Sequence, residues 1–312
     1  MDKNNGLDWY PSKAAPPGQQ ALHRPFIYHI PKTGGTTLQV ILTRAYDVLL
    51  STLAKQGHKL PPLAIGRIET MDEATPEGLS KNYVLMSSHM PFPFHQQFAS
   101  DFELVTIVRE PFRRLVSSFT YSMARARRRP TLEDFSAFIA DENNRNYQAK
   151  FLAGAPFEEP AQSTDAGARA WANLQEHFTY FGTTHHIQAI ASRLLAQSSL
   201  PNVLAERLNK TRAVHPLDVS QFEQEALSLN AEDIELYERI AAAPRLGEMN
   251  EGDQRPPHPT TIVSYEAPES SSERFVGKSG IIATAQILPH IKNGKMPRAA
   301  FDQLLANATQ GG

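Results

Sequence analysis

Short apolar runs, separated by polar stretches that contain Gly and Pro, organise the first part of the chain. Three of these runs, at residues 26–30, 83–86 and 104–108, end in polar clusters, which is typical of buried strands. Apolar residues recur at helical spacing after the first run and again from Pro111, a residue that the first turn of a helix tolerates. Strands that alternate with helices predict an α/β fold, with a largely parallel sheet and helices on both faces.

Similar patterns predict the elements that follow. Thr131 and Asp134 approximate a capping box, which marks the start of a helix. Residues 47–82, which include two adjacent prolines, are expected to form loops and at most one short helix. The remaining expected elements are a short strand at Tyr180-Phe181 and helices over residues 167–178, 186–196 and 231–242.

Three regions differ in character along the chain. Residues 1–24 are polar and Pro-rich and contain no apolar signal core, so we expect a flexible leader. Residues 25–244 hold the alternating strands and helices and form one predicted domain. Residues 245–312 open with Pro-, Ser- and Glu-rich segments and end in a weak helical pattern. We interpret this last region as a C-terminal extension of unknown role.

The composition narrows the function classes. The chain is 41% hydrophobic and 21% charged, as expected for a globular protein, and its net charge of -2 gives no reason to expect a nucleic-acid partner. The absence of cysteine excludes disulfides, thiolate metal sites and cysteine nucleophiles. No apolar run reaches the ~18 residues that a membrane helix needs. A cytoplasmic protein is the simplest expectation, and no sequence feature indicates its oligomeric state.

The polar clusters after the three strands indicate where a ligand would bind. They are the stretch from Lys32 to Thr37, then His89, then Arg109. In an open α/β sheet, ligands bind beyond the carboxyl ends of the parallel strands. If the three strands are parallel neighbours, their clusters converge on one site.

The first cluster, in the sequence IPKTGGTT, has the features of a phosphate-binding loop. Glycines let the backbone approach an anion, and the N–H groups and dipole at a helix start attract phosphate. Lys32 adds a positive charge, but it precedes both glycines, whereas the Walker A motif has its lysine after the last glycine. A Gly-rich turn without a ligand is the alternative interpretation.

This loop resembles the 5'-phosphosulfate loop of sulfotransferases that use 3'-phosphoadenosine 5'-phosphosulfate (PAPS). It is most similar to the heparan and uronyl 2-O-sulfotransferases and their bacterial relatives, which carry P-K-[TS]-[GA]-[GS]-[TS]-[TS]. The resemblance implies a sulfotransferase-type three-layer fold with a P-loop-like sheet over residues 25–244. It also implies that Lys32 acts on the bridging and 5'-phosphate oxygens of PAPS. The other implied contacts to the 5'-phosphate are Thr33, Gly34, Gly35, Thr36 and Thr37.

A second motif, VTIVREPFRRLVSSFTY, resembles the 3'-phosphate motif of the same family, R-[DE]-P-x-x-R-x-x-S. The resemblance implies that Arg109 and Ser117 bind the 3'-phosphate, and arginine suits this role because it makes paired, charge-assisted bonds to phosphate. Glu110 stands where many relatives have Asp, and Arg113 is an additional base. An arginine paired with a nearby carboxylate is the alternative.

Weaker matches follow at NYQAKFLAG (146–154), at DIELYERI (233–240) and at LNKTR (208–212). The last would close over the nucleotide and bring Lys210 and Arg212 to it. An exposed basic loop explains LNKTR equally well.

Transfer of a sulfuryl group to a hydroxyl needs a base, and histidine suits this role near neutral pH. His89 follows the second strand and is the predicted base, although relatives carry H-x-H where this chain has Ser87-Ser88-His89. A histidine that satisfies a local backbone bond is the alternative. His29 is interpreted as structural. The adjacent His185 and His186 do not share a helix face, and no carboxylate cluster completes a site, so we predict no metal.

The predicted reaction is in-line attack of an acceptor hydroxyl, on a carbohydrate, at the sulfur of PAPS. The exposed run Arg125, Arg127, Arg128 and Arg129 is either an ordinary solvated helix end or a binding rim for an acidic glycan. Two other functions stay open. One is a P-loop kinase dependent on ATP and Mg²⁺, and the other is a nucleotide-binding protein without catalytic activity.

Overall fold

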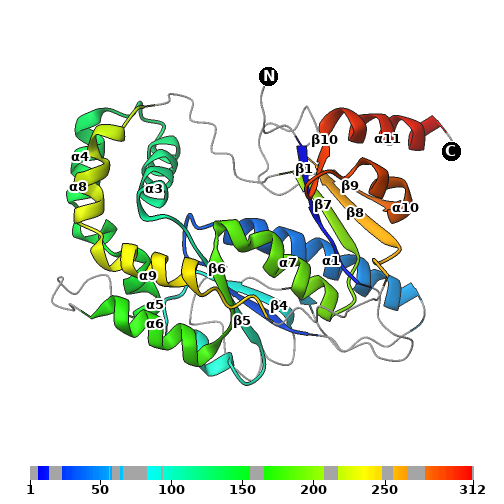
Figure 1. Cartoon of the computed structure of the whole chain (residues 1–312), viewed down its shortest axis with the longest axis horizontal. Helices are drawn as coiled ribbons and strands as arrows, with labels where there is room; N and C mark the ends of the chain where they lie inside the picture. The colour runs from blue at the N-terminus through cyan, green and yellow to red at the C-terminus, as the bar shows by residue number, and fades with distance from the viewer. Residues whose placement is uncertain are drawn as a thin grey trace.

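The chain forms two five-stranded sheets with helices packed between and around them (Figure 1). This arrangement comes from a computed structural model. The residues that the structure describes are 6–13, 23–55, 57, 64–65, 83–92, 94–154, 165–206, 217–247, 256–265 and 278–310.

One sheet is entirely parallel, with the strand order β3-β4-β2-β5-β6. Alternate residues of its strands pack on opposite faces: Leu104 and Val108 on one face, Val105 and Ile107 on the other. Burial on both faces explains why these strands read as continuous apolar runs. The strands are β2 (Pro25–Tyr28), β3 (Ala64–Ile65), β4 (Tyr83–Ser88), β5 (Glu103–Val108) and β6 (Phe178–Thr183).

Helices cover both faces of the parallel sheet. On one face, α1 (Gly35–Lys55) and α7 (Ile187–Gln197) pack against it. The other face is covered by α5 (Tyr147–Ala153), α6 (Ala166–His177) and α9 (Ala231–Ala242). The predicted fold class, a parallel α/β sheet between helical layers, is therefore confirmed.

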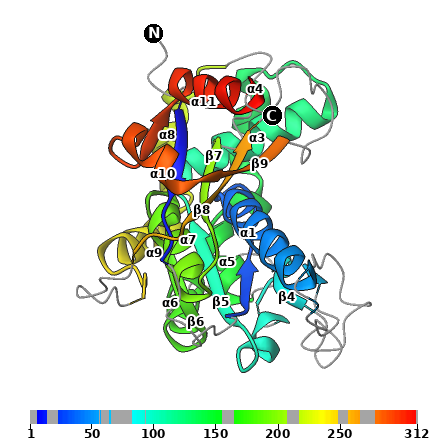
Figure 2. The same ribbon diagram turned by 90° about the vertical axis from the view of Figure 1, so that its right-hand side faces the viewer.

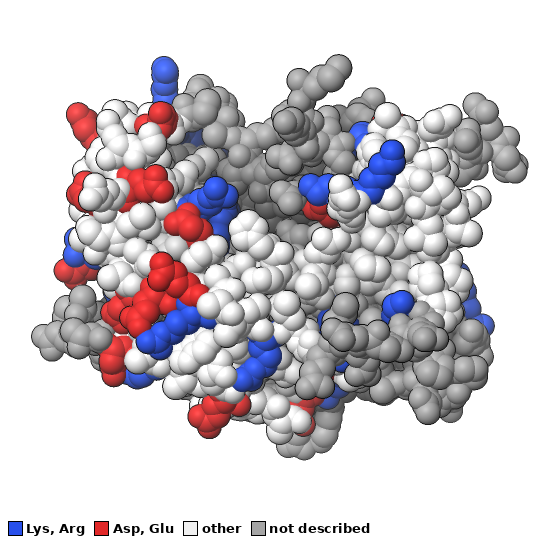
Figure 3. Space-filling model, viewed as in Figure 1, with Lys and Arg blue, Asp and Glu red and all other residues white. Residues whose placement is uncertain are grey.

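Helices α3 (Pro111–Ala126), α4 (Leu132–Ala140) and α8 (Glu223–Ser228) form a helical lobe with its own apolar cluster. The predicted capping box is present at α4: Thr131 Oγ1 accepts from the Asp134 N–H at 3.1 Å, and the Asp134 carboxylate accepts from the Thr131 N–H. On the face shown in Figure 3, acidic and basic side chains are interspersed over this lobe.

The second sheet is mixed, with the order β10-β1-β7-β8-β9. Strand β1 is antiparallel to β7 and β10, β7 is parallel to β8, and β8 is antiparallel to β9. Its outer face packs on α10 (Thr284–Ile287) and α11 (Arg298–Gln310). The strands are β1 (Gly6–Tyr10), β7 (Asn202–Glu206), β8 (Thr260–Tyr265), β9 (Lys278–Ala283) and β10 (Lys295–Pro297).

Helices α1 and α7 lie between the two sheets, as Figure 2 shows from the side. One apolar cluster joins Leu38 and Ile41 of α1 to Val105 of the parallel sheet and to Val203 and Ile262 of the mixed sheet. The layers follow as outer helices, parallel sheet, α1 and α7, mixed sheet, and α10 with α11. The two sheets therefore share one core instead of forming separate domains.

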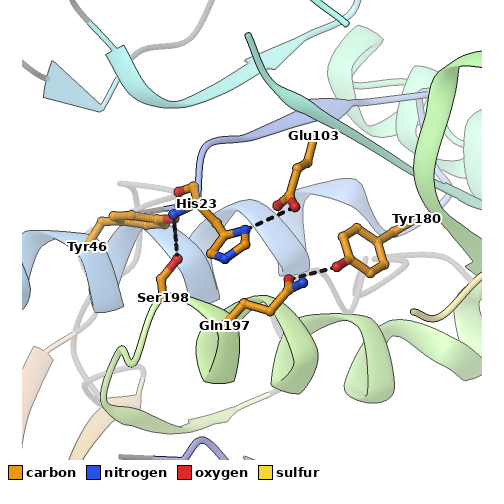
Figure 4. A network of polar contacts seen from close by, with 6 residues as sticks. All are labelled: His23, Tyr46, Glu103, Tyr180, Gln197 and Ser198. Atoms are coloured by element: carbon orange, nitrogen blue, oxygen red, sulfur yellow. Dashed lines mark hydrogen bonds and ion pairs between the residues drawn. The ribbon is translucent and has the colours of Figure 1, made fainter. Parts of the chain in front are cut away.

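Polar contacts at the amino-terminal edge of the parallel sheet tie α1 and α7 to the chain before β2 (Figure 4). His23 Nδ1 lies 3.0 Å from the Glu103 carboxylate, and its backbone N–H donates to Ser198 Oγ at 3.1 Å. The Tyr46 hydroxyl, whose pKa is raised by burial, lies 3.3 Å from the same Ser198 oxygen. These contacts fix the segment before β2 at the amino-terminal edge of the sheet.

The mixed sheet crosses the predicted domain boundaries. The predicted flexible leader, 1–24, contains β1, which pairs with two other strands. The predicted boundary at residue 244 separates β7 from β8, which pair in one sheet, so the extension from residue 245 contributes to the same core. Helix α1 also continues to Lys55, into the region expected to be loops.

Among the described residues, no helix is both long and apolar enough to cross a membrane.

Candidate active site

The carboxyl ends of β4, β2 and β5 lie side by side at one edge of the parallel sheet. Tyr28, the last residue of β2, pairs with Ser88 on one side and with Thr106 on the other. The segments that follow these strands also touch: the His29 N–H donates to the Ser88 carbonyl at 2.9 Å, and Arg109 Nη1 donates to the Lys32 carbonyl at 3.3 Å. The three clusters singled out in the sequence are thus brought together.

Two glycines allow the loop after β2 to turn tightly into α1. Gly34 has a φ of 98°, and a Cβ there would lie 2.8 Å from Ile187 Cδ1. A Cβ at Gly35 would lie 2.3 Å from the ring of His29. Lys32 also has a positive φ, 71°. The positive φ favours glycine at position 34, and the packing against His29 requires it at position 35.

The start of α1 presents backbone N–H groups at the same place. The first hydrogen bonds of the helix run from the Thr37 and Leu38 N–H groups to the Gly34 carbonyl, so the N–H groups of Gly35 and Thr36 precede them. The first turn contains no acidic residue. By contrast, the carboxylate of Glu110 caps α3 by accepting from two backbone N–H groups at 2.8 Å each. The field at the start of α1 favours an anion.

Thr33 is the member of the loop that turns inward. Its hydroxyl donates to the Ile30 carbonyl at 2.8 Å, and the residue is 1% exposed. The hydroxyl therefore shapes the loop, whereas Thr36 and Lys32 are only half-buried.

The Lys32 ammonium lies over the ring of Tyr121, 4.2 Å from its centroid. This cation–π contact brings α3 against the loop. Ser117 lies one turn before Tyr121, so both side chains belong to the same face of α3. Tyr121 was not among the predicted site residues, although its i+4 spacing from Ser117 was a usable signal.

Arg109 connects the loop to α3. It lies directly after β5, and its guanidinium is partly buried against the loop carbonyl of Lys32. Burial lowers the pKa of Arg109, Arg113 lowers it further, and Glu110 opposes both effects. An arginine keeps its charge despite such a shift. Its charge near the start of α1 makes this edge of the sheet attractive to phosphate groups.

His89 is held in one tautomer by the backbone. Its Nδ1 lies 2.8 Å from the His29 carbonyl oxygen. Because a carbonyl only accepts, Nδ1 carries the proton and Nε2 of the neutral ring is left as a proton acceptor. The alternative interpretation of His89 was a local backbone bond. The bond that is present reaches a carbonyl 60 residues away and is compatible with a role as a base.

A second imidazole stands beside His89. The ring of His29 lies 4.3 Å from that of His89, tilted by 36°, and also packs on Gly35. His29 was predicted to be structural, and the chain lacks the first histidine of the H-x-H pattern. In space, the residue that directly follows β2 supplies a second histidine.

The turn after β6 also borders the loop, since the Thr184 methyl group lies 3.7 Å from where a Gly34 Cβ would stand. His186 Nδ1 accepts from the Thr183 N–H at 3.0 Å, and burial lowers the pKa of His186, with a smaller contribution from His185. Within the described residues, no group of three or more His, Asp or Glu side chains could hold a metal ion.

Other predicted residues lie apart from this edge or outside the described residues. Lys210 and Arg212 belong to residues 207–216, which lie outside the described residues. Arg128 pairs with Asp134 at 2.8 Å, and Arg127 ends α3 in a left-handed conformation. Those two arginines therefore have structural roles at the end of α3.

A model of the sulfotransferase family matches residues 23–237, which is most of the chain. The chain belongs to the sulfotransferase family. The match confirms the predicted enzyme class, a PAPS-dependent sulfotransferase, while the finer resemblance to 2-O-sulfotransferases stays a prediction. The matched region begins just before β2 and ends within α9, so it covers the whole parallel sheet of this sulfotransferase.

Among solved structures, retinol dehydratase in a complex with retinol and PAP is similar to this sulfotransferase at 12% identity. The alignment covers 73% of this chain and 75% of that chain, with a TM-score of 0.28. No curated protein sequence matches the chain.

Proposed function

We propose that this sulfotransferase moves the sulfuryl group of PAPS onto a hydroxyl of a carbohydrate, with His89 as the general base. The observation that carries the proposal is the meeting of the glycine loop, Arg109 and His89 at one edge of the parallel sheet. A cationic anion site beside a histidine in a defined tautomer suits transfer from an anionic donor.

The donor would lie along the loop and α3. The N–H groups at the start of α1 and the Lys32 ammonium would hold the 5' end, and Arg109 with Ser117 would hold the 3'-phosphate. Two observations support this fit: the first turn of α1 contains no acidic residue, and the α3 face that carries Ser117 lies against Lys32. The groups are already assembled, which reduces the reorganisation required in the reaction.

The chemistry requires one bond to form and one to break. The acceptor oxygen attacks sulfur as the bond from sulfur to the phosphate oxygen breaks, and the acceptor proton passes to Nε2 of His89. Lys32 would stabilise the negative charge that develops on the departing phosphate oxygen. Adenosine 3',5'-bisphosphate (PAP) and a sulfate ester are the products.

A carbohydrate with acidic groups is the acceptor class that we propose. Arg125 lies one turn beyond Tyr121 on α3, so the face that contacts Lys32 continues to a cation at the exposed end of the helix. A carboxylate on the acceptor would interact there without competing for the donor phosphates. The resemblance to uronyl 2-O-sulfotransferases supports the same class.

The test is transfer of labelled sulfate from PAPS to a panel of uronic-acid glycans, neutral glycans, phenols and simple alcohols. We expect product with the acidic glycans and none when ATP with Mg²⁺ replaces PAPS. PAP should also raise the melting temperature much more than AMP, because AMP lacks the 3'-phosphate that Arg109 and Ser117 would bind. A ligand at a hundredfold excess over its Kd stabilises the folded state by about 2.7 kcal/mol. Equal shifts with PAP and AMP, or transfer only to phenols, would contradict the proposal.

A further inference from the structure

Helices α5 and α9, which carry the two weaker sequence landmarks, cap each other. Asp233 of α9 accepts from the backbone N–H groups of Gln148 at 3.2 Å and Ala149 at 2.7 Å, near the start of α5. In return, Asn146 Oδ1 accepts from the N–H groups of Glu232 at 3.1 Å and Asp233 at 3.3 Å. The two helix starts are therefore fixed relative to each other.

Gln148 extends this arrangement to the active site. Its Oε1 accepts from the Arg109 N–H at 2.8 Å, and its Nε2 donates to the Arg109 carbonyl at 2.9 Å. Both backbone groups of Arg109 are thus bound by one side chain that is 1% exposed. Arg109 stands between the end of β5 and the start of α3, where neither a sheet ladder nor a helix would fix its backbone.

The amide of Gln148 is well suited to this contact. A carboxamide side chain offers an acceptor and a donor in one plane at any pH, which the N–H and C=O of a single residue require. These partners determine which end of the amide is nitrogen. Asp233 Oδ2 lies 3.4 Å from the same Nε2 and supports that orientation.

We propose that Gln148 is a positioning residue for the contact between Arg109 and the 3'-phosphate, and that Asp233 orients Gln148. By fixing the backbone of Arg109, Gln148 holds the guanidinium toward the loop, where it already bonds the Lys32 carbonyl. The inference rests on the proposed function, in which Arg109 binds the 3'-phosphate of PAPS. It also gives the landmarks at residues 146–154 and 233–240 a role in nucleotide binding.

A purely structural role makes a different prediction. If Gln148 only joined α5 to the rest of the fold, its loss would lower the stability of the protein and weaken the binding of all nucleotides alike. If it positions Arg109, its loss weakens the binding of ligands with a 3'-phosphate and leaves the binding of ligands without one unchanged. The ratio of the Kd of AMP to the Kd of PAP separates the two roles.

The test is isothermal titration of PAP and AMP into the wild-type chain and three variants. Gln148→Met removes both bonds at similar volume, and Gln148→Glu keeps an acceptor for the Arg109 N–H but loses the donor. The control is Gln188→Met on α7, because Gln188 Nε2 also donates to a backbone carbonyl, that of Trp9, at 2.6 Å, although Gln188 is exposed. Melting curves accompany each titration.

We expect Gln148→Met to raise the Kd of PAP on the order of tenfold, as partners that orient ligating groups typically do, and to leave the Kd of AMP within about twofold. The Kd of PAP for Gln148→Glu should lie between those of Gln148→Met and the wild type. If Gln148→Met does not fold, Gln148→Glu provides the test. Gln188→Met should keep the wild-type ratio.

Two failures are distinguishable. A wild-type chain that binds PAP and AMP equally would overturn the 3'-phosphate assignment within the proposed function. A wild-type chain that prefers PAP, with a Gln148→Met variant that keeps the same ratio, would overturn the positioning role alone.

Discussion

The two sheets of this sulfotransferase are built from different kinds of sequence. The strands of the parallel sheet lie between residues 25 and 183, in the order expected of strands alternating with helices. The mixed sheet draws β1 from near the start of the chain, β7 from residues 202–206 and three strands from beyond residue 259. The first sheet is local in sequence, and the second joins distant segments.

The sheets also differ in what their polar groups do. At the parallel sheet, Arg109 and His89 follow strands and face the glycine loop. In the mixed sheet, Asn202 is buried and fully used: it accepts from the Ser12 N–H at 2.7 Å and donates to the His258 carbonyl at 2.6 Å and to Thr284 Oγ1 at 2.9 Å. We infer that the parallel sheet carries the chemistry and the mixed sheet contributes stability.

The largest expected effect comes from the proposed base. His89→Ala should lower turnover by about 10²–10⁴, since general-base catalysis typically contributes that much. PAP binding should be retained, because His89 would contact the acceptor and not the nucleotide. Single-turnover transfer and a PAP titration measure the two quantities, and a melting curve verifies the fold. A variant that transfers sulfate at the wild-type rate would place the base elsewhere.

Lys32→Ala should reduce turnover by about 10²–10³, the usual cost of losing one group that stabilises transition-state charge. The loss should exceed any weakening of PAP binding, because the ammonium acts on charge that develops during the reaction. Lys295→Ala is the matched control. Lys295 belongs to the mixed sheet, and its ammonium lies 3.8 Å from the Asp8 carboxylate. Equal losses in both variants would remove the distinction between the sheets.

The mixed sheet should respond in stability instead. Leu204 is fully buried with Leu7 and Val263, so Leu204→Ala should lower the free energy of unfolding by about 2–5 kcal/mol. Urea denaturation measures it, and turnover per folded molecule should be unchanged. Leu288→Ala is the control because Leu288 is 43% exposed, and its effect should stay within about 0.5 kcal/mol. A Leu204→Ala variant with normal stability and low turnover would contradict the inference.

The difference between the sheets also explains what could be predicted from sequence. The strands of the parallel sheet are buried on both faces, so β2, β4 and β5 stand out as apolar runs, and the polar residues after them could be predicted to converge. Strand β1, GLDWY, is short and alternates Leu7 and Trp9 with polar neighbours. Its partners are about 200 and 290 residues away along the chain, and local patterns do not reveal such pairing.

Within the site, the sequence indicated which residues come together but not how their side chains touch. The contact between Lys32 and Tyr121 and the ring contact between His29 and His89 depend on how separate elements pack. Gln148 was part of a noted landmark, yet its two bonds to the Arg109 backbone follow from the placement of α5 by α9. Such contacts are set by tertiary packing.

The smallest expected effect concerns the core beneath the parallel sheet. His95 is completely buried among Phe26, Tyr28 and Phe94, with ring centroids 4.6, 4.3 and 5.4 Å away. Among the described residues, neither ring nitrogen has a hydrogen-bond partner, and burial holds the pKa of His95 well below its usual value. The folded protein therefore keeps this histidine neutral under conditions in which the unfolded chain protonates it.

The sign of the pH dependence follows from that difference. As the pH falls below about 6.5, the unfolded chain takes up a proton that folded His95 refuses, so the free energy of unfolding decreases by up to about 1.4 kcal/mol per pH unit. His95→Phe keeps an aromatic ring but removes this titration, so the variant should lose less stability than the wild type between pH 7 and pH 5. Urea denaturation across that range measures both slopes, while the offset between the two proteins at pH 8 reports packing alone. Equal slopes of the free energy of unfolding against pH in the two proteins would mean that His95 is protonated in the folded core. The core next to the parallel sheet would then hold a buried charge.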